Sequence, residues 1–151
     1  MKLIKKIKSF LFEINYPQNF AKSLELESLG KLEEALTLLN RYEDFIKKNT
    51  VLDLDYFLIR SRLFYRIGNF EKAILDANII LENLKYLDND SEINFLYKKK
   101  YLYLLLSNIY YKLNNKEWEK YYELFESIDN NIIIDKRLNS LYHFWFPILK
   151  P

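Results

Sequence analysis

Side chains that commonly carry out chemistry are scarce or isolated in this chain. Its 151 residues include one histidine, His143, and no cysteine. One histidine without cysteine builds neither a familiar zinc site nor a Cys–His nucleophile pair. His143 stands in the aromatic run YHFWF at 142–146, which favours a structural role. The lack of cysteine also excludes a disulfide framework, so we expect a cytoplasmic protein.

The acidic residues also lack the spacing of a catalytic or metal site. The run DNDSE at 88–92 has closely spaced oxygen ligands, but Ile93 occupies the position where a calcium loop needs glycine. Pairs such as Glu33–Glu34 fall in the first turn of a predicted helix, where carboxylates interact favourably with the helix dipole. No phosphate-binding glycine loop occurs. We therefore expect a non-catalytic protein with no cofactor and no metal.

The basic residues raise nucleic acid as an alternative partner. The segment YKKKY at 97–101 alternates basic and aromatic residues, as nucleic-acid grooves do. It stands alone beside the acidic run at 88–92, and the net charge of +2 comes from well-mixed signs. We expect no nucleic-acid partner. A nucleic-acid-associated helical protein that uses the lysines of 2–8 and 98–100 is the lesser alternative.

The first residues form an amphipathic pattern. Lys2, Lys5, Lys6 and Lys8 lie largely opposite a helical face that carries Leu3, Ile4, Ile7, Phe10, Leu11 and Ile14. Such a helix either lies on a membrane surface or packs on the next helix with its lysines in water; we favour packing. Lys8 and Glu13 interrupt the apolar stretch and no cleavage site follows, so we expect neither a signal peptide nor a membrane span.

The composition predicts a single all-α domain over 1–151. Half of the residues are hydrophobic and 17% are aromatic, so a large core is available. Two glycines and three prolines supply little of the turn chemistry that β-sheets need. Pro17 suits the first turn of a second helix, and Asp53 suits an N-cap. The predicted helices cover 1–15, 17–29, 31–48, 54–67, 69–84, 93–113, 117–128 and 135–146.

The two glycines occupy matching positions of a repeated phrase. Gly30 lies in SLGKLEEALTL and Gly68 in RIGNFEKAILD. With the glycines aligned, the following residues pair: Ser23 with Ser61, Leu26 with Phe64, Leu32 with Phe70, Glu33 with Glu71, and Ala35 with Ala73. In a weaker third copy Ser107 and Tyr110 match and Asn114 replaces glycine, but Trp118 arrives two residues late. We expect a longer turn and a looser helix crossing in this third copy.

This pattern resembles the tetratricopeptide repeat, a helix–turn–helix unit of about 34 residues. Small residues let the two helices of a unit approach closely, and glycine permits the turn. The resemblance implies a right-handed α-solenoid of about three such TPR-like units over 17–129. The opening helix 1–15 and a closing helix 135–146 would cap its two ends. The alternative is a generic helical bundle with a chance similarity.

The resemblance also implies a binding face. In that family the first helices of successive units line a concave surface that holds a peptide or a protein. Mapped by register, this surface includes Glu27. The residues on it that we expect to bind the partner are Phe20, Leu24, Asp55, Leu58, Arg62, Tyr65, Arg66, Tyr101, Leu104, Asn108, Tyr111 and Lys112. Arg62 and Arg66 are four residues apart, and with Lys112 and Asn108 they are expected to bind carboxylates of an acidic segment. The alternative is that these residues are solvated charges and core tyrosines.

The sequence thus predicts a protein-binding module that holds one protein partner on its concave face. It would act as a dedicated inhibitor, such as an immunity protein that blocks a toxin. Alternatively, it would be an adapter or a secretion chaperone that holds an extended peptide segment of an effector. Its aromatic ends leave open whether two copies associate into a homo-oligomer.

Overall fold

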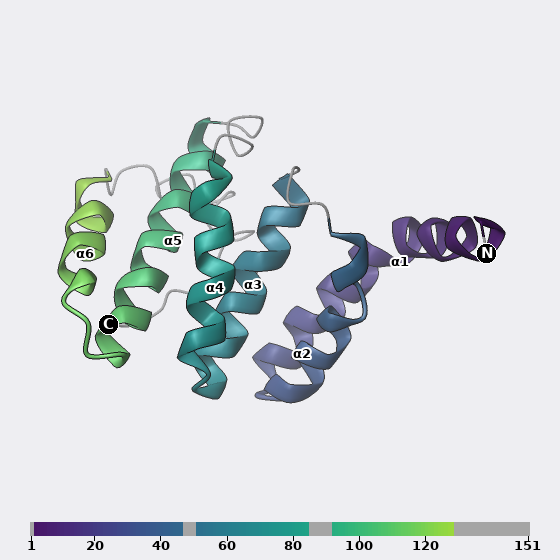
Figure 1. Cartoon of the computed structure of the whole chain (residues 1–151), viewed down its shortest axis with the longest axis horizontal. Coiled ribbons are helices and arrows are strands. Elements are labelled where there is room, and N and C mark those ends of the chain that lie inside the picture. Colours follow the sequence, from purple (N-terminus) through teal and green to yellow (C-terminus); the bar gives the residue numbers. More distant parts are fainter. Residues whose placement is uncertain (1, 47–50, 85–91, 129–151) are drawn as a thin grey trace.

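The computed structural model describes residues 2–46, 51–84 and 92–128, and every element in these ranges is a helix (Figure 1). This confirms the all-α fold class. The elements are α1 (Lys2–Ser28), α2 (Leu32–Asn40), the 3-10 helix η1 (Glu43–Phe45), α3 (Val51–Ile67), α4 (Phe70–Glu82), α5 (Glu92–Lys112) and α6 (Glu117–Ser127). None of these helices combines the length and the apolar character needed to cross a membrane. The predicted closing helix 135–146 lies outside the described residues.

The helices pack mainly against their neighbours in the chain. Three helical hairpins form, from α1 with α2, α3 with α4, and α5 with α6. Contacts of α2 with α3, and of α4 and α3 with α5, join successive hairpins. Figure 1 shows the result: the helices follow one another across the molecule in chain order, from α1 at one end to α6 at the other.

The three hairpin turns share one backbone geometry. A residue with positive φ closes the first helix of each hairpin: Gly30 (φ 76°), Gly68 (φ 93°) and Asn114 (φ 54°). The next residue donates its N–H to a carbonyl five residues earlier, from Lys31 to Leu26 (2.9 Å), from Asn69 to Phe64 (2.8 Å) and from Asn115 to Tyr110 (2.9 Å). This bond is typical of a left-handed helix cap. The predicted helix ends at both glycines, and the left-handed role of Asn114, are confirmed.

A buried serine joins the two helices of each hairpin. Its hydroxyl donates to a backbone carbonyl of the second helix: Ser23 to Ala35 (3.1 Å), Ser61 to Ala73 (2.7 Å) and Ser107 to Trp118 (3.1 Å). A hydroxyl on so short a side chain reaches that carbonyl only where the two helices lie close together. The third hairpin differs in detail, because α6 begins three residues after Asn114 whereas α2 and α4 begin two residues after their glycines.

Three predicted helix boundaries are wrong. α1 is continuous through Pro17, so an opening helix 1–15 and a second helix starting at 17 do not form. A proline inside a helix removes one hydrogen bond and can kink the helix without ending it. The second helix of the first hairpin ends at Asn40 and is followed by η1 rather than running to residue 48. Asp53 lies in the first turn of α3, where it meets the helix dipole, and is not the N-cap.

The core centres on α3 and α5. Residues 56–64 of α3 and 101–109 of α5 are all buried, so these two helices are covered around their whole circumference. A helix that is buried all round needs apolar residues on every face, or charges that are paired inside. α3 contains two such charges, Arg60 and Arg62.

Candidate functional site

Seven of the twelve predicted binding residues are buried inside the chain, and one of the seven, Asn108, also lines a pocket. Phe20, Leu24, Leu58, Arg62, Tyr101 and Leu104 are each 5% exposed or less. No partner reaches these side chains while the helices are packed in this way. The expectation that these six residues form an open concave surface is therefore not met, because the helices of neighbouring hairpins cover the face that carries them.

Arg62 already binds a carboxylate of its own chain. Its Nε donates to Oε2 of Glu27 at 3.0 Å, and its Nη2 donates to Oε1 of the same carboxylate. Nη1 donates to the hydroxyl of Tyr101 at 3.2 Å. Burial alone lowers the pKa of the Arg62 guanidinium, but Tyr101 and Glu27 outweigh burial and raise that pKa, so the residue stays charged. Arg62 joins α1, α3 and α5, and does not offer a charge to a partner.

A second buried arginine holds α4 against α3. Arg60 donates from Nε to Oδ2 of Asp76 at 2.7 Å and from Nη2 to Oδ1 at 2.8 Å. Its guanidinium also lies 5.2 Å from the ring centroid of Tyr56, and Nη1 is 3.2 Å from the exposed Glu43 carboxylate of η1. This pair was not predicted from the sequence. Because the pair is bidentate and buried, we attribute to it a role in stabilising the contact between α3 and α4.

Two more predicted residues have partners within the chain. Asp55 of α3 is half-buried and forms an ion pair with Lys98 of α5 at 3.2 Å. Arg66 donates from Nη1 to the Glu27 carbonyl at 3.3 Å and lies 3.6 Å from the Glu27 carboxylate, while 37% of its side chain is exposed. Arg66 is therefore reachable from solvent, but its position is set by Glu27.

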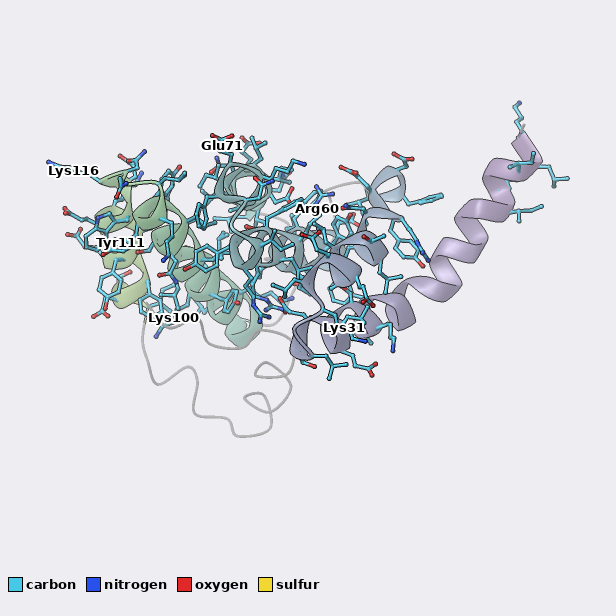
Figure 2. All side chains as sticks on the ribbon, turned by 90° about the horizontal axis from the view of Figure 1, so that it is seen from below. Lys31, Arg60, Glu71, Lys100, Tyr111 and Lys116 are labelled. Atoms are coloured by element: carbon cyan, nitrogen blue, oxygen red, sulfur yellow. The ribbon has the colours of Figure 1, made fainter. Side chains whose placement is uncertain are left out.

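The remaining four predicted residues line one pocket. Tyr65, Asn108, Tyr111 and Lys112 surround a cavity of about 640 Å³, together with Ser107, Trp118 and Tyr122. The cavity lies where the last turns of α3 and α5 meet the first turns of α6. Figure 2 shows Tyr111 at the α5–α6 end of the molecule. These four members of the predicted set come together at one hollow surface.

Aromatic rings form the walls of this pocket, and each ring is held by a neighbour. Trp118 meets Tyr111 edge to face, with ring centroids 5.7 Å apart, and meets Tyr122 at 6.5 Å. Tyr65 packs on Phe70 of α4 at 5.8 Å. Such ring contacts are favourable beyond the burial of area alone and limit the freedom of the side chains. The pocket therefore presents preformed apolar surfaces.

The pocket also contains a polar group without a partner. Asn108 is 7% exposed, and its Nδ2 is buried with no hydrogen bond to any described residue. An unsatisfied buried donor costs about 1–3 kcal/mol, and a native structure that keeps one usually has a reason. The neighbouring Ser107 hydroxyl is already committed to the Trp118 carbonyl. Asn108 therefore borders the pocket and has an amide donor that no described residue satisfies.

The charge of the pocket favours a bound group that accepts hydrogen bonds over a bound cation. Lys112 is exposed and is the only residue with a formal charge at neutral pH among those that line the cavity. Burial raises the pKa of Tyr65, and a hydrogen bond to Glu126 is the main cause that raises the pKa of Tyr122, so both hydroxyls stay neutral. A positive side chain beside an N–H donor attracts a carbonyl or a carboxylate and disfavours an ammonium group.

Trp118 and Tyr122 were missed as site residues in the sequence. The prediction placed the binding surface on the first helices of the units, whereas these two residues belong to α6, the second helix of its hairpin. Their signal was present in the sequence, because two aromatic residues four positions apart lie on the same face of a helix. Only the packing of α6 on α5 shows that this face borders the predicted tyrosines.

No metal site emerges from the described part of the chain. Within residues 2–46, 51–84 and 92–128, no group of three or more His, Cys, Asp or Glu side chains is placed to hold a metal ion. The run at 88–92 is only partly described, and His143 lies outside the described residues.

Comparison with known proteins gives no match. No family model matches the chain, and no curated protein or solved structure shows significant similarity to it. A function must therefore be inferred from the pocket and from the three matching hairpins.

Proposed function

We propose that this chain is a non-catalytic protein-binding module whose pocket between α3, α5 and α6 anchors one protein partner. The observation that carries the proposal is the buried, unpaired Asn108 amide inside an aromatic pocket. Tyrosine and tryptophan are enriched among the residues that dominate binding energy at protein interfaces. A cavity of about 640 Å³ is also within the size range of ligand pockets, so it holds one or two side chains with adjoining backbone.

The pocket specifies what the partner inserts. An apolar or aromatic side chain fits against the rings of Tyr111, Trp118 and Tyr122. A carbonyl or carboxylate oxygen accepts from Asn108 once its amide, which is buried in this structure, turns toward the pocket. The exposed Lys112 favours acidic groups next to the inserted residue. Because the rings hold one another in place, binding orders few side chains and loses little entropy. These requirements suit a short extended segment or a protruding loop.

The scaffold is proposed to be a right-handed α-solenoid of three TPR-like units. Support comes from the same positive-φ residue and the same serine-to-carbonyl bond in each hairpin. In this proposal the partner is not held along the first helices, because the Glu27–Arg62 pair fills that face. It is held at the end of the array, where the third hairpin meets the last turn of α3.

Two roles in the cytoplasm fit this proposal. An adapter or chaperone would hold an extended segment of its client in the pocket. A neutraliser of a toxin would insert one loop of the toxin into the same pocket and cover a larger surface around it. The size of the pocket favours the adapter or chaperone role. The cavity has room for only a few residues of a partner, which suits a short segment better than the broad surface of a toxin.

Tyr111 offers a direct test, because its side chain is 61% exposed and its removal should leave the fold intact. We expect the chain, immobilised, to retain one partner from native cytosol, and Tyr111→Ala to reduce that retention at least about tenfold, as expected for an interface anchor. The matched control is Leu75→Ala, since Leu75 is 64% exposed on α4 and does not line the pocket. Equal loss of the partner in both variants would contradict the proposed site.

A further inference from the structure

The first two turns of α1 expose a row of large apolar side chains. Leu3 is 69% exposed, Ile4 is 58% and Ile7 is 49%. Figures 1 and 2 show why, since the N-terminal part of α1 projects away from the other helices. The sequence-based preference for an opening helix that packs on the next helix is therefore not met by these three residues. Exposed apolar residues that cluster on one element indicate an interaction surface.

The same turns hold a local excess of positive charge. Four lysines occur in the first eight residues, and the first acidic residue is Glu13. These four charges exceed the net charge of +2, so the rest of the chain is net acidic. Lys2 and Lys6 are exposed beside the apolar row. The cationic character of the protein is thus concentrated on the helix that projects from its body.

We propose that the N-terminal part of α1 is an interfacial anchor that lies on a bilayer of anionic lipids. Leu3, Ile4 and Ile7 would enter the boundary between headgroups and acyl chains, and the flanking lysines would contact the headgroups. A helix that has one apolar face and one lysine-rich face, with charges too frequent for a membrane span, lies in a membrane surface rather than across it. Lysine stems can also bury along apolar surface while the ammonium group stays in water.

Charge complementarity favours an anionic bilayer over a second copy of the chain and over a nucleic acid as the partner of this helix. A second copy of the chain would bring two lysine-rich segments together, and their repulsion opposes pairing along this face. A nucleic acid would neutralise Lys2 and Lys6 but leave Leu3, Ile4 and Ile7 in water. An anionic bilayer satisfies both the apolar row and the lysines. The anchor is independent of the proposed binding function, because Figure 2 shows α1 projecting from the end of the molecule opposite Tyr111.

Co-sedimentation of the full chain with vesicles tests this proposal. We expect binding to vesicles of phosphatidylcholine and phosphatidylserine that weakens as salt is raised, and much weaker binding to phosphatidylcholine alone. Replacing Leu3, Ile4 and Ile7 together by serine should lower the partition coefficient about tenfold or more. Lys2→Gln and Lys6→Gln should each lower it about fivefold. The matched controls on α4, Leu75→Ser and Lys72→Gln, should bind as the wild type does.

Three outcomes would overturn the anchor. The first is no binding of the wild type to the anionic vesicles at low salt. The second is full binding by the serine variant, which would mean that the lysines act as a diffuse polycation or serve a nucleic acid. The third is a concentration-dependent dimer in sedimentation velocity that Ile7→Ser abolishes, which would show that a second copy covers the row. Circular dichroism of each variant confirms that the helices are retained.

Discussion

Glu27 and Arg62 form a buried ion pair that joins α1 to α3, with 4% and 1% of their side chains exposed. Two guanidinium nitrogens bind the carboxylate, and a third binds the hydroxyl of Tyr101 on α5. One arginine therefore ties together the first helices of all three hairpins. This contact explains why the face that carries Arg62 is closed to a partner.

Breaking this pair should destabilise the protein strongly. Arg62→Met leaves the Glu27 carboxylate buried beside the more distant Arg66, and removal of one partner of a buried pair costs about 3–5 kcal/mol. The double variant Arg62→Met with Glu27→Leu should recover much of that loss, because two apolar side chains need no compensation. Urea unfolding of the single and double variants measures both values. Lys22→Met, which removes an exposed pair with Glu25, is the control and should cost less than about 1 kcal/mol.

The serine contacts predict a close crossing of the two helices in each hairpin. Ser61→Ala removes the 2.7 Å bond to the Ala73 carbonyl and should cost about 1 kcal/mol in thermal or urea unfolding. Ala73→Leu should cost more, about 1–3 kcal/mol or above, because Ala73 is fully buried at the crossing. Ser28→Ala removes an exposed local bond and serves as the control. If Ala73→Leu were tolerated as easily as Ser28→Ala, the crossing would be looser than described.

The hairpin turns predict opposite effects at Gly68 and Asn114. A Cβ added at Gly68 would meet no atom within 4 Å, so the cost of Gly68→Ala comes from its φ of +93° alone and should be about 1–2 kcal/mol. Asn114→Gly relieves the same kind of backbone strain and should be neutral or slightly stabilising. Chemical denaturation of the two variants checks the signs. A stabilised Gly68→Ala would contradict the left-handed turn.

Buried tyrosines predict a loss of stability at alkaline pH. Burial raises the pKa of Tyr56 to about 12, while its hydroxyl donates to the Leu39 carbonyl at 3.0 Å. Burial likewise raises the pKa of Tyr101. In the unfolded chain these phenols ionise near pH 10, whereas the folded chain keeps them protonated. For Tyr56 the free energy of unfolding should therefore hold below pH 10 and fall between pH 10 and about 12, by about 1.4 kcal/mol per pH unit. Tyr101 should add a fall that also begins near pH 10.

Tyr56→Phe isolates one contribution to that fall. The variant has no phenol to ionise at this position, so its stability should decrease less steeply between pH 10 and 12 than that of the wild type. The slope is the relevant quantity, because the loss of the hydrogen bonds to Leu39 and Arg60 lowers stability at every pH. Equal slopes in the two proteins would mean that Tyr56 ionises as readily in the folded chain as in the unfolded one.

Local signals in the sequence predicted the hairpins well. Gly30, Gly68 and Asn114 close the first helices because glycine and asparagine tolerate positive φ, and that preference acts within a few residues. Ser23 and Ser61 were recognised by their spacing from the glycines, and their contacts follow from the same spacing. Pro17 misled the prediction, because a proline suited to a helix start also occurs within a continuous helix.

The binding residues were harder to predict, because their environment depends on distant segments. Arg62 lies on a face that would be exposed if α3 stood alone, but its partner Glu27 is 35 residues earlier in the chain. The pocket depends on α6, which brings Trp118 and Tyr122 beside residues of α3 and α5. Periodicity shows which residues share one helix face, but it does not show which neighbouring helix covers that face.

Asn108→Leu separates stability from binding at the proposed site. The substitution keeps the number and branching of the side-chain heavy atoms and removes a buried donor with no partner among the described residues. Leucine is larger than asparagine, but the added volume can extend into the neighbouring pocket, so the variant should unfold at about the same urea concentration as the wild type. If Asn108 served packing alone, its replacement would not lower the affinity for the partner while leaving the stability unchanged.

The affinity of Asn108→Leu for the retained partner, measured by titration beside the wild type, tests the central claim most directly. We predict a dissociation constant raised at least about tenfold, since the partner's acceptor loses its buried hydrogen bond and is left unpaired. An unchanged dissociation constant in this folded variant would contradict the assignment of the pocket as the binding site.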